Sequence, residues 1–269
     1  MSIRVLYVDI DGTLVGPGGS LFLDGDGHFQ IETASALGRA REAGIEVALL
    51  SGRSRPSMVE LARIIDAPTW IGELGALRCY DHGRSPVHDY GEYPGHGAPI
   101  DDLRAAAEKL WTQHPRQLEE HGPWNAYREA SFMVRGEVGE GDVRSWLDAN
   151  GYDWVDFLDN GVIPRPFPGL DVETVRVYHL VPRGVSKALA IVADQQHRDI
   201  APDECAVIGD AHSDLECASV VARAFITANA VVKDPTLPAA IDAVANAEVT
   251  PRGYGLGFAD AVDTLLGAQ

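Results

Sequence analysis

Four aspartates lie at or within a few residues of the ends of short apolar runs of the sequence. Asp9 and Asp11 follow R-V-L-Y-V, and Asp210 and Asp214 follow a second apolar run near the other end of the chain. If these runs are parallel strands, the carboxylates gather beyond their carboxyl ends, where open sheets bind ligands. Carboxylates this close repel one another and stay ionised beside a cation. Oxygen ligands without nitrogen or sulfur favour Mg²⁺, so we expect a magnesium site.

Residues that can bind phosphate oxygens also follow an apolar run or begin an expected helix. Ser51-Gly52-Arg53 follows another apolar run, and Lys187 opens an expected helix. The Ser51 hydroxyl, the Lys187 ammonium and the backbone N–H groups near Gly52 would bind phosphate oxygens, aided by the helix that starts after Arg53. A carboxylate such as Asp9 could then act as a nucleophile through an acyl phosphate. Asp11, two residues on, could protonate the leaving alcohol and later deprotonate the attacking water.

The composition and net charge limit the classes of ligand that the protein can bind. The 269 residues are 45% hydrophobic and 23% charged, with a net charge of -18. Nucleic acid and acidic membrane surfaces need basic partners, so a small phosphate ester is the expected ligand. Three cysteines without a C-x-x-C pair indicate neither a disulfide scaffold nor a zinc site, and a reducing cytoplasm fits best. There is no secretory leader pattern and no 18-residue apolar run. Monomer and homodimer both remain open.

Strands and helices alternate at both ends of the chain, which predicts a doubly wound, Rossmann-like parallel sheet. Its strands are expected at 4–8, 46–50, 69–71, 205–208 and 222–226, and its helices at 32–43, 56–65, 186–196, near 213 and twice after 226.

The middle of the chain has a different pattern. A hairpin is expected over 77–80 and 86–90, and α-β-β-α-β-β follows. The helices are expected at 101–114 and 142–150, and the strands at 116–120, 126–134, 153–159 and 173–181. This predicts an α/β core made of residues 1–83 and 183–269, and an inserted α+β cap of residues 84–182. The tryptophans Trp111, Trp124, Trp146 and Trp154 are expected to pack inside the cap.

In their order along the chain, these motifs resemble those of the haloacid dehalogenase superfamily of phosphohydrolases. The matching residues are Asp9-Ile10-Asp11-Gly12-Thr13, Ser51-Gly52-Arg53, Lys187, and Gly209-Asp210 with Ser213-Asp214. The resemblance implies that Asp9 is the nucleophile and Asp11 the acid and base. It further implies that Asp9, the Asp11 carbonyl and Asp210 hold Mg²⁺, while Ser51 and Lys187 bind the phosphoryl group.

The spacing of the motifs is also informative. The long segment between Arg53 and Lys187 must contain the cap, which resembles the type IIB caps of Cof-like phosphatases. Sucrose-phosphate, mannosyl-phosphoglycerate and trehalose-phosphate phosphatases look similar. Two positions depart from the family pattern, because Ser213 and Leu74 stand where its members usually have asparagine.

The resemblance implies a phosphoric monoester hydrolase acting on a sugar or polyol phosphate. Candidates for binding the substrate are Arg53 and, in the cap, Arg128, Arg135, Arg165 and His179. Two alternatives use the same motifs. A phosphomutase of the phosphomannomutase kind would share the core and the cap, and a non-catalytic phosphate-binding module would share the scaffold alone.

Overall fold

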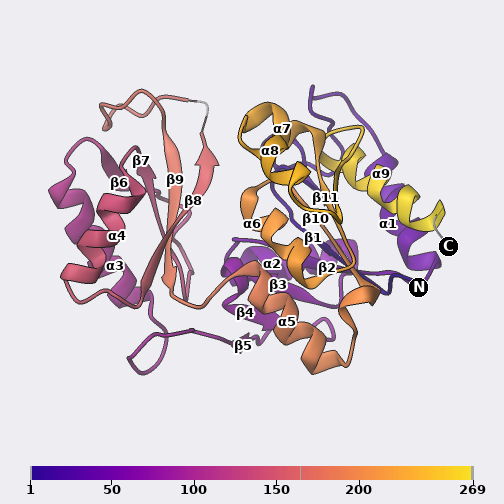
Figure 1. Cartoon of the computed structure of the whole chain (residues 1–269), viewed down its shortest axis with the longest axis horizontal. Helices are drawn as coiled ribbons and strands as arrows, with labels where there is room; N and C mark the ends of the chain where they lie inside the picture. Colours follow the sequence, from indigo (N-terminus) through magenta and orange to yellow (C-terminus); the bar gives the residue numbers. More distant parts are fainter. Residues whose placement is uncertain (1, 164, 268–269) are drawn as a thin grey trace. The chain divides into compact units, whose positions relative to one another are not determined.

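The computed structural model describes residues 2–163 and 165–267, which divide into two compact units (Figure 1). The first, here the core, comprises 1–53, 57–87 and 186–269, and the second, the cap, comprises 54–56 and 88–185. The sequence-based boundaries after 83 and after 182 lie a few residues earlier in the chain. The short segment 54–56, which groups with the cap, was not expected there.

An eight-stranded sheet organises the core. Its strands, in spatial order, are β12 (Ala247–Val249), β11 (Arg223–Ile226), β10 (Cys205–Gly209), β1 (Val5–Val8), β2 (Glu46–Leu50), β3 (Trp70–Gly72), β4 (Leu77–Cys79) and β5 (Val87–His88). The strands from β12 to β3 run parallel, and β4 is antiparallel to β3. The doubly wound sheet is therefore confirmed. Because β1 pairs with both β10 and β2, the chain segments that leave these three strands begin side by side.

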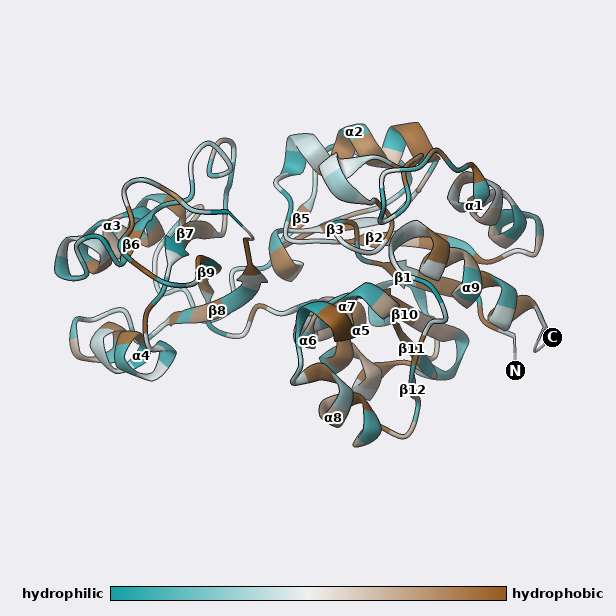
Figure 2. Ribbon diagram, turned by 90° about the horizontal axis from the view of Figure 1, so that it is seen from above, coloured by the Kyte–Doolittle hydropathy of each residue, from teal (hydrophilic) through white to brown (hydrophobic). Residues whose placement is uncertain are grey.

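Helices cover both faces of this sheet. They are α1 (Glu32–Glu42), α2 (Arg55–Ile65), α5 (Lys187–Arg198), α6 (His212–Leu215), α7 (Ala228–Lys233), α8 (Leu237–Asp242) and α9 (Tyr254–Gly267). Leu6 and Val8 point to one face, where they pack with α1, α2 and α9. Val5 and Tyr7 point to the other, with α5. Both faces of β1 are thus buried, which explains why its sequence is apolar throughout. Hydrophobic colour runs through β1, β2 and β3 in Figure 2.

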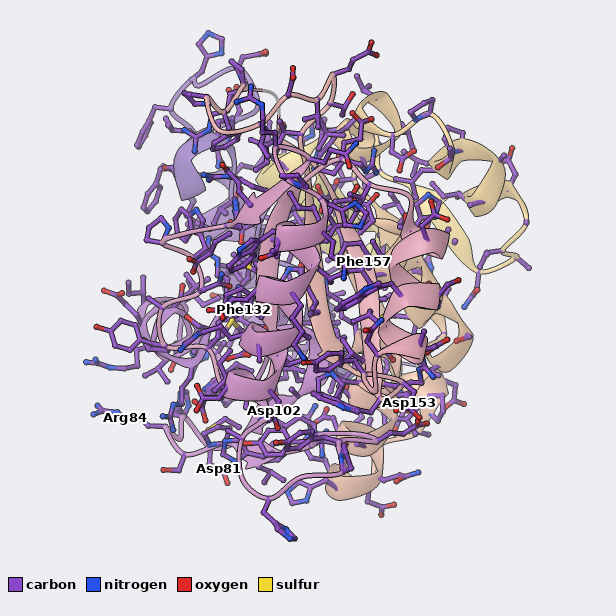
Figure 3. The ribbon with its side chains drawn as sticks, turned by 90° about the vertical axis from the view of Figure 1, so that its left-hand side faces the viewer. Asp81, Arg84, Asp102, Phe132, Asp153 and Phe157 are labelled. Carbon is purple, nitrogen blue, oxygen red and sulfur yellow. The ribbon has the colours of Figure 1, made fainter. Side chains whose placement is uncertain are left out.

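The cap is an antiparallel sheet with two helices. Its sheet has the order β6-β7-β9-β8. The elements are α3 (Ile100–Gln113), β6 (Leu118–Glu120), β7 (Phe132–Gly136), α4 (Glu140–Ala149), β8 (Val155–Val162) and β9 (Arg176–Pro182). Phe132 and Phe157 share a buried cluster with Leu103 of α3 and Leu147 of α4. Figure 3 views the cap from the side of its helices and labels both phenylalanines. The expected α-β-β-α-β-β order is present.

Three details differ from the expectations. The strand expected at 126–134 begins only at Phe132, because residues 121–131 form turns held by Asn125, which hydrogen-bonds the N–H and the carbonyl of Met133. The end of the chain adds the strand β12 and three helices after β11 rather than two helices. Trp124 is 62% exposed instead of packed, since it lies in those turns.

Among the described residues, no helix combines the length and the apolar composition that crossing a bilayer requires.

Candidate active site

Asp9 lies in the first residue position after β1, with its side chain buried. Its N–H donates to the Ile208 carbonyl at 2.9 Å, so the register of β1 on β10 sets its position. The turn that follows requires glycine at position 12. Gly12 has a φ of +89°, and a Cβ there would lie 2.1 Å from Oδ2 of Asp210. The aspartates of two strands are close together because this residue has no side chain.

Lys187 links two of the carboxylates. It is the first residue of α5, and Ser186 before it caps the helix by accepting from the Leu189 N–H. The Lys187 Nζ donates to Oδ1 of Asp9 and to Oδ1 of Asp214, each at 2.7 Å. All three side chains are buried. The expected meeting of Lys187 with the first and last motifs is therefore present in the structure.

Asp214 is bound on both of its oxygens. Oδ1 accepts from Lys187, and Oδ2 accepts from the N–H groups of Asp210 and Ala211 at 3.1 Å each. These bonds tie the turn after β10 to the lysine. The carboxylate oxygens of Asp9 and Asp210 are therefore more available as ligands for a cation than those of Asp214.

The buried charges shift one another's pKa. Burial opposes the charge of Lys187, but the carboxylates of Asp214 and Asp9 raise its pKa, so it is an ammonium ion at neutral pH. Burial raises the pKa of Asp9, and the nearby carboxylates of Asp214 and Asp210 add to that effect while Lys187 opposes it. Burial also raises the pKa of Asp210 to about 6. Two ammonium groups, Lys187 and the more distant Lys233, thus face the three carboxylates of the cluster, which favours a further cation.

The carboxylates fit a divalent metal ion. One oxygen each from Asp9, Asp210 and Asp214 lie within 4.8 Å of one another. The donor set is entirely oxygen, as Mg²⁺ prefers. Burial is the main cause of the raised pKa values of Asp9 and Asp210, and neighbouring carboxylates add to it, so a bound cation would stabilise the ionised forms.

Ser51 is the first residue after β2, the strand that pairs with β1. Its side chain is buried, and its Oγ accepts from the Arg53 N–H at 3.3 Å. Arg53 does not point into solvent, because its Nε and Nη2 donate to the two carboxylate oxygens of Asp11 at 2.7 and 2.6 Å. Gly52 between them is half-buried. The second motif therefore lies next to the first, as expected from the order of the strands.

The segment Glu73-Leu74-Gly75 supports this loop through its backbone. The N–H of Leu74 donates to the Ser51 carbonyl, and the N–H of Glu73 donates to the Arg53 carbonyl. All three residues have positive φ. A Cβ at Gly75 would lie 2.5 Å from the Ser186 carbonyl, so the segment packs closely on the start of α5. Leu74 thus serves by its main chain where family members usually have asparagine.

Ser213, the other departure, forms no side-chain hydrogen bond with any described residue. Its neighbour Asp214 already holds Lys187, and Ser213 adds nothing to that contact.

The sequence reasoning missed three residues of the site. Thr227 and Asn229 donate to the Gly12 carbonyl at 3.4 and 2.9 Å, which fixes the turn after Asp11. Lys233 of α7 places Nζ 3.7 Å from Oδ2 of Asp210. Thr227 directly follows β11, so the rule that drew attention to the other strand ends would have found it. Nothing in the sequence marks Lys233.

The four other substrate candidates belong to the cap. His179 of β9 pairs in register with Met133 of β7, and Arg135 lies two residues further along β7. Arg128 is buried and donates to the Ser131 Oγ at 2.6 Å. Arg165 lies over the ring of Phe167. Their role in substrate binding stays a prediction.

Comparison with known proteins gives a consistent result. No protein-family model matches the chain. The chain is 23% identical over 269 residues to the phosphoglycolate phosphatase of Methanococcoides burtonii, and the match covers 99% of this chain and 98% of that protein.

Solved structures match over the full length. A Thermoplasma acidophilum protein superimposes with a TM-score of 0.70 at 19% identity, with 99% of both chains covered. The sucrose-phosphatase of Synechocystis, in complex with sucrose and phosphate, gives 0.69 at 18%, with 98% of both covered. A haloacid dehalogenase-like hydrolase from Bacteroides thetaiotaomicron gives 0.66 at 17%, covering 98% of this chain and 100% of that one.

This chain has the haloacid dehalogenase fold. The fold explains the arrangement of the core, because Asp9, Ser51 and Asp210 directly follow the carboxyl ends of the adjacent strands β1, β2 and β10. Its cap, an antiparallel sheet with two helices on one face, is present as well.

Proposed function

We propose that this protein is a magnesium-dependent phosphatase that hydrolyses a small phosphate monoester through a phosphorylated Asp9. The contact between Lys187 and Asp9 carries the proposal. Lys187 holds Oδ1 of Asp9 at 2.7 Å, and no described residue hydrogen-bonds its Oδ2. A buried carboxylate with one fixed oxygen and one open oxygen is suited to attack phosphorus.

In the first step, Oδ2 of Asp9 forms a bond to phosphorus as the bond to the leaving oxygen breaks. Asp11 gives its proton to that oxygen, and the alcohol departs. Lys187 and the Ser51 hydroxyl hold oxygens of the phosphoryl group and balance their charge. Asp214 keeps the Lys187 ammonium in place through its own hydrogen bond.

In the second step, a water molecule replaces the alcohol. Asp11, now a carboxylate, takes a proton from the water as its oxygen attacks phosphorus. The bond between phosphorus and Asp9 breaks, and inorganic phosphate is released with the carboxylate of Asp9 restored. One residue thus serves as acid and then as base.

The carboxylates of Asp9 and Asp210, with the main-chain carbonyl of Asp11, would hold the magnesium ion. When bound, Mg²⁺ supplies positive charge that offsets the phosphoryl oxygens and keeps the carboxylates ionised. Asp214 remains a candidate ligand in the same cluster.

Two kinds of comparison support the phosphatase class. A phosphoglycolate phosphatase matches by sequence, and a sucrose-phosphatase matches by structure. We infer a small organic phosphate as substrate, with sugar and polyol phosphates as the class implied by the motifs. The net charge of -18 supports a small molecule over nucleic acid as the partner.

The test is a panel of phosphate esters that includes 2-phosphoglycolate and hexose phosphates, assayed for released phosphate with Mg²⁺ and with EDTA. Asp9→Asn is expected to abolish turnover and EDTA to stop the wild type. Asp242→Asn, an exposed aspartate of α8, is the matched control that keeps activity. Turnover by a folded Asp9→Asn protein would refute the mechanism. Isomerised esters without released phosphate would instead indicate a mutase.

A further inference from the structure

The main-chain carbonyl of Gly12 accepts hydrogen bonds from a distant part of the chain. The Nδ2 of Asn229 donates to it at 2.9 Å, and the Oγ1 of Thr227 donates at 3.4 Å. Thr227 directly follows β11, and Asn229 is the second residue of α7. All of these residues belong to the core. Because Gly12 directly follows Asp11, the proposed acid and base, these bonds act on the backbone that carries the Asp11 side chain.

The turn that carries Asp11 has weaker restraints of its own. The Gly12 N–H donates to the Val15 carbonyl at 3.3 Å, which is longer than the usual range for such bonds. The Thr13 N–H donates to the Ile10 carbonyl at the same distance. Gly12 has a φ of +89° and no side chain that would restrict its backbone. The 2.9 Å bond to the Gly12 carbonyl is therefore a shorter restraint on this turn than either of the two.

Asn229 can hold the turn because its own amide group is fixed at the other end. Its Oδ1 accepts from the Tyr254 N–H at 2.7 Å. The residue before Tyr254 is Gly253, and a Cβ there would lie 2.8 Å from the same Oδ1, so the glycine leaves room for the amide. A main-chain N–H only donates and a carbonyl only accepts, so the reversed amide would lose both contacts. Only one orientation of the Asn229 side chain serves Gly12 and Tyr254 together.

The segment that leads to Tyr254 is anchored to two helices of the core. The Arg252 N–H donates to Asp260 of α9 at 2.9 Å, and its guanidinium group donates to both carboxylate oxygens of Glu32 of α1, also at 2.9 Å. Helices α1 and α9 contribute to one buried apolar cluster with the sheet. The contact through the asparagine therefore links the turn after β1 to a part of the core that is held by its own ion pairs and packing.

We propose that Asn229 is a positioning residue for the proton transfer by Asp11. By holding the Gly12 carbonyl, it keeps the backbone of Asp11 in the orientation from which the carboxyl group reaches the leaving oxygen. This inference rests on the proposed phosphatase function and adds a residue to its mechanism. Asn229 acts through Gly12 and Asp11, so its loss should affect the proton transfer first.

The nucleophile is held separately from this asparagine. The Asp9 N–H donates to the Ile208 carbonyl at 2.9 Å, and Lys187 holds the Asp9 carboxylate at 2.7 Å. Loss of the Asn229 amide should therefore impair protonation of the leaving alcohol and leave the attack on phosphorus intact. Esters with different leaving groups separate the two effects, because nitrophenolate departs without a proton and an alcohol does not.

The test measures kcat and KM of the full-length protein for p-nitrophenyl phosphate and for the alkyl ester of the panel that is hydrolysed fastest. Asn229→Ala should lower kcat for the alkyl ester about 10- to 100-fold and kcat for p-nitrophenyl phosphate less than about threefold, with both KM values little changed. Asn229→Asp keeps an acceptor for the Tyr254 N–H but has no donor for the Gly12 carbonyl. Its loss on the alkyl ester should therefore match that of Asn229→Ala.

Asn246→Ala is the matched control. Asn246 is half-buried like Asn229, and its Nδ2 donates to the carbonyls of Ala218 and Val221 at 2.9 Å each, just before β12. This variant should lose stability in urea, as Asn229→Ala does, yet keep both kcat values. Hydrogen exchange adds a measurement that needs no substrate. The amides of residues 12–15 should exchange faster in Asn229→Ala than in the wild type, and at the wild-type rate in Asn246→Ala.

Three results would count against the positioning role while the phosphatase stands. They are an equal loss of kcat on both esters, full activity of Asn229→Asp on the alkyl ester, and unchanged exchange of residues 12–15 in Asn229→Ala. A wild type that releases no phosphate from any ester would instead refute the phosphatase, and the positioning role with it.

Discussion

Arg53 holds both carboxylate oxygens of Asp11, through Nε at 2.7 Å and Nη2 at 2.6 Å. The Asp11 side chain is 61% exposed and that of Arg53 is 26% exposed, so the arginine is the better anchored partner. The guanidinium group occupies both carboxylate oxygens, whereas the proposed acid must present one of them to the leaving group. The pair therefore has to open before Asp11 can protonate a leaving group, and Arg53 positions Asp11 until then.

Arg53→Gln should slow the hydrolysis of esters whose leaving alcohol must be protonated. Without the two hydrogen bonds, the exposed Asp11 side chain can turn into solvent, and kcat for an alkyl phosphate should fall about 10- to 100-fold. p-Nitrophenyl phosphate, whose leaving group needs no proton, should change little. Arg53→Lys keeps the positive charge but cannot hydrogen-bond both oxygens of Asp11 at once, so its kcat should lie between those of the wild type and Arg53→Gln. An equal loss on both esters would contradict a positioning role.

Lys187→Met should destabilise the protein strongly. It leaves Asp9 and Asp214 buried without their shared ammonium ion, and breaking such a buried group costs about 3–5 kcal/mol. The double variant Lys187→Met/Asp214→Asn should recover part of that loss, since one unpaired carboxylate is removed. Urea unfolding of the four proteins in the cycle measures the coupling. Simple additivity of the two single changes would argue against the contact.

Asp210 should make the stability of the metal-free protein depend on pH. Its pKa is raised from 3.8 to about 6 by burial, so the folded state holds the proton more tightly than the unfolded chain does. This contribution is fully present below pH 3.8 and is lost as the pH rises through about 6. The loss should be on the order of 1–3 kcal/mol.

The measurement compares the wild type and Asp210→Asn by urea unfolding between pH 5 and 7.5, with EDTA. The unfolding free energy of the variant should not decline over this range. Mg²⁺ at pH 7.5 should stabilise the wild type but not the variant. Wild-type stability that rises over this range relative to the variant would show the opposite linkage and contradict the prediction.

Gly12→Ala should damage the site far more than the fold. The new Cβ would lie 2.1 Å from Oδ2 of Asp210, in addition to the strain of a φ of +89°. We expect activity to fall at least about 100-fold, on the scale of a misplaced catalytic group. Gly44→Ala has a similar φ of +80° but open space around its Cβ, so it should lose about 1 kcal/mol of stability and keep its activity. Equal activities of the two variants would sink this explanation.

Some of the site was accessible from local patterns. Unbroken apolar runs identified β1, β2 and β10, and the rule that ligands bind beyond strand ends pointed to Asp9, Ser51 and Asp210. The predicted start of β7, at residue 126, was wrong, and the reason is also local. The apolar run that begins at Phe132 was extended back to residue 126, but the hydrogen bonds of Asn125 to Met133 hold the segment before Phe132 in turns.

The sequence alone determined which elements form and which residues stand at their ends, because the hydrophobic pattern that makes a strand is carried by adjacent residues. Only the tertiary structure decided which side chains meet. Lys187 bridges Asp9 and Asp214, and Arg53 holds Asp11, across 178, 27 and 42 residues of sequence. Such contacts depend on strand register and helix packing throughout the core, and no local pattern records them.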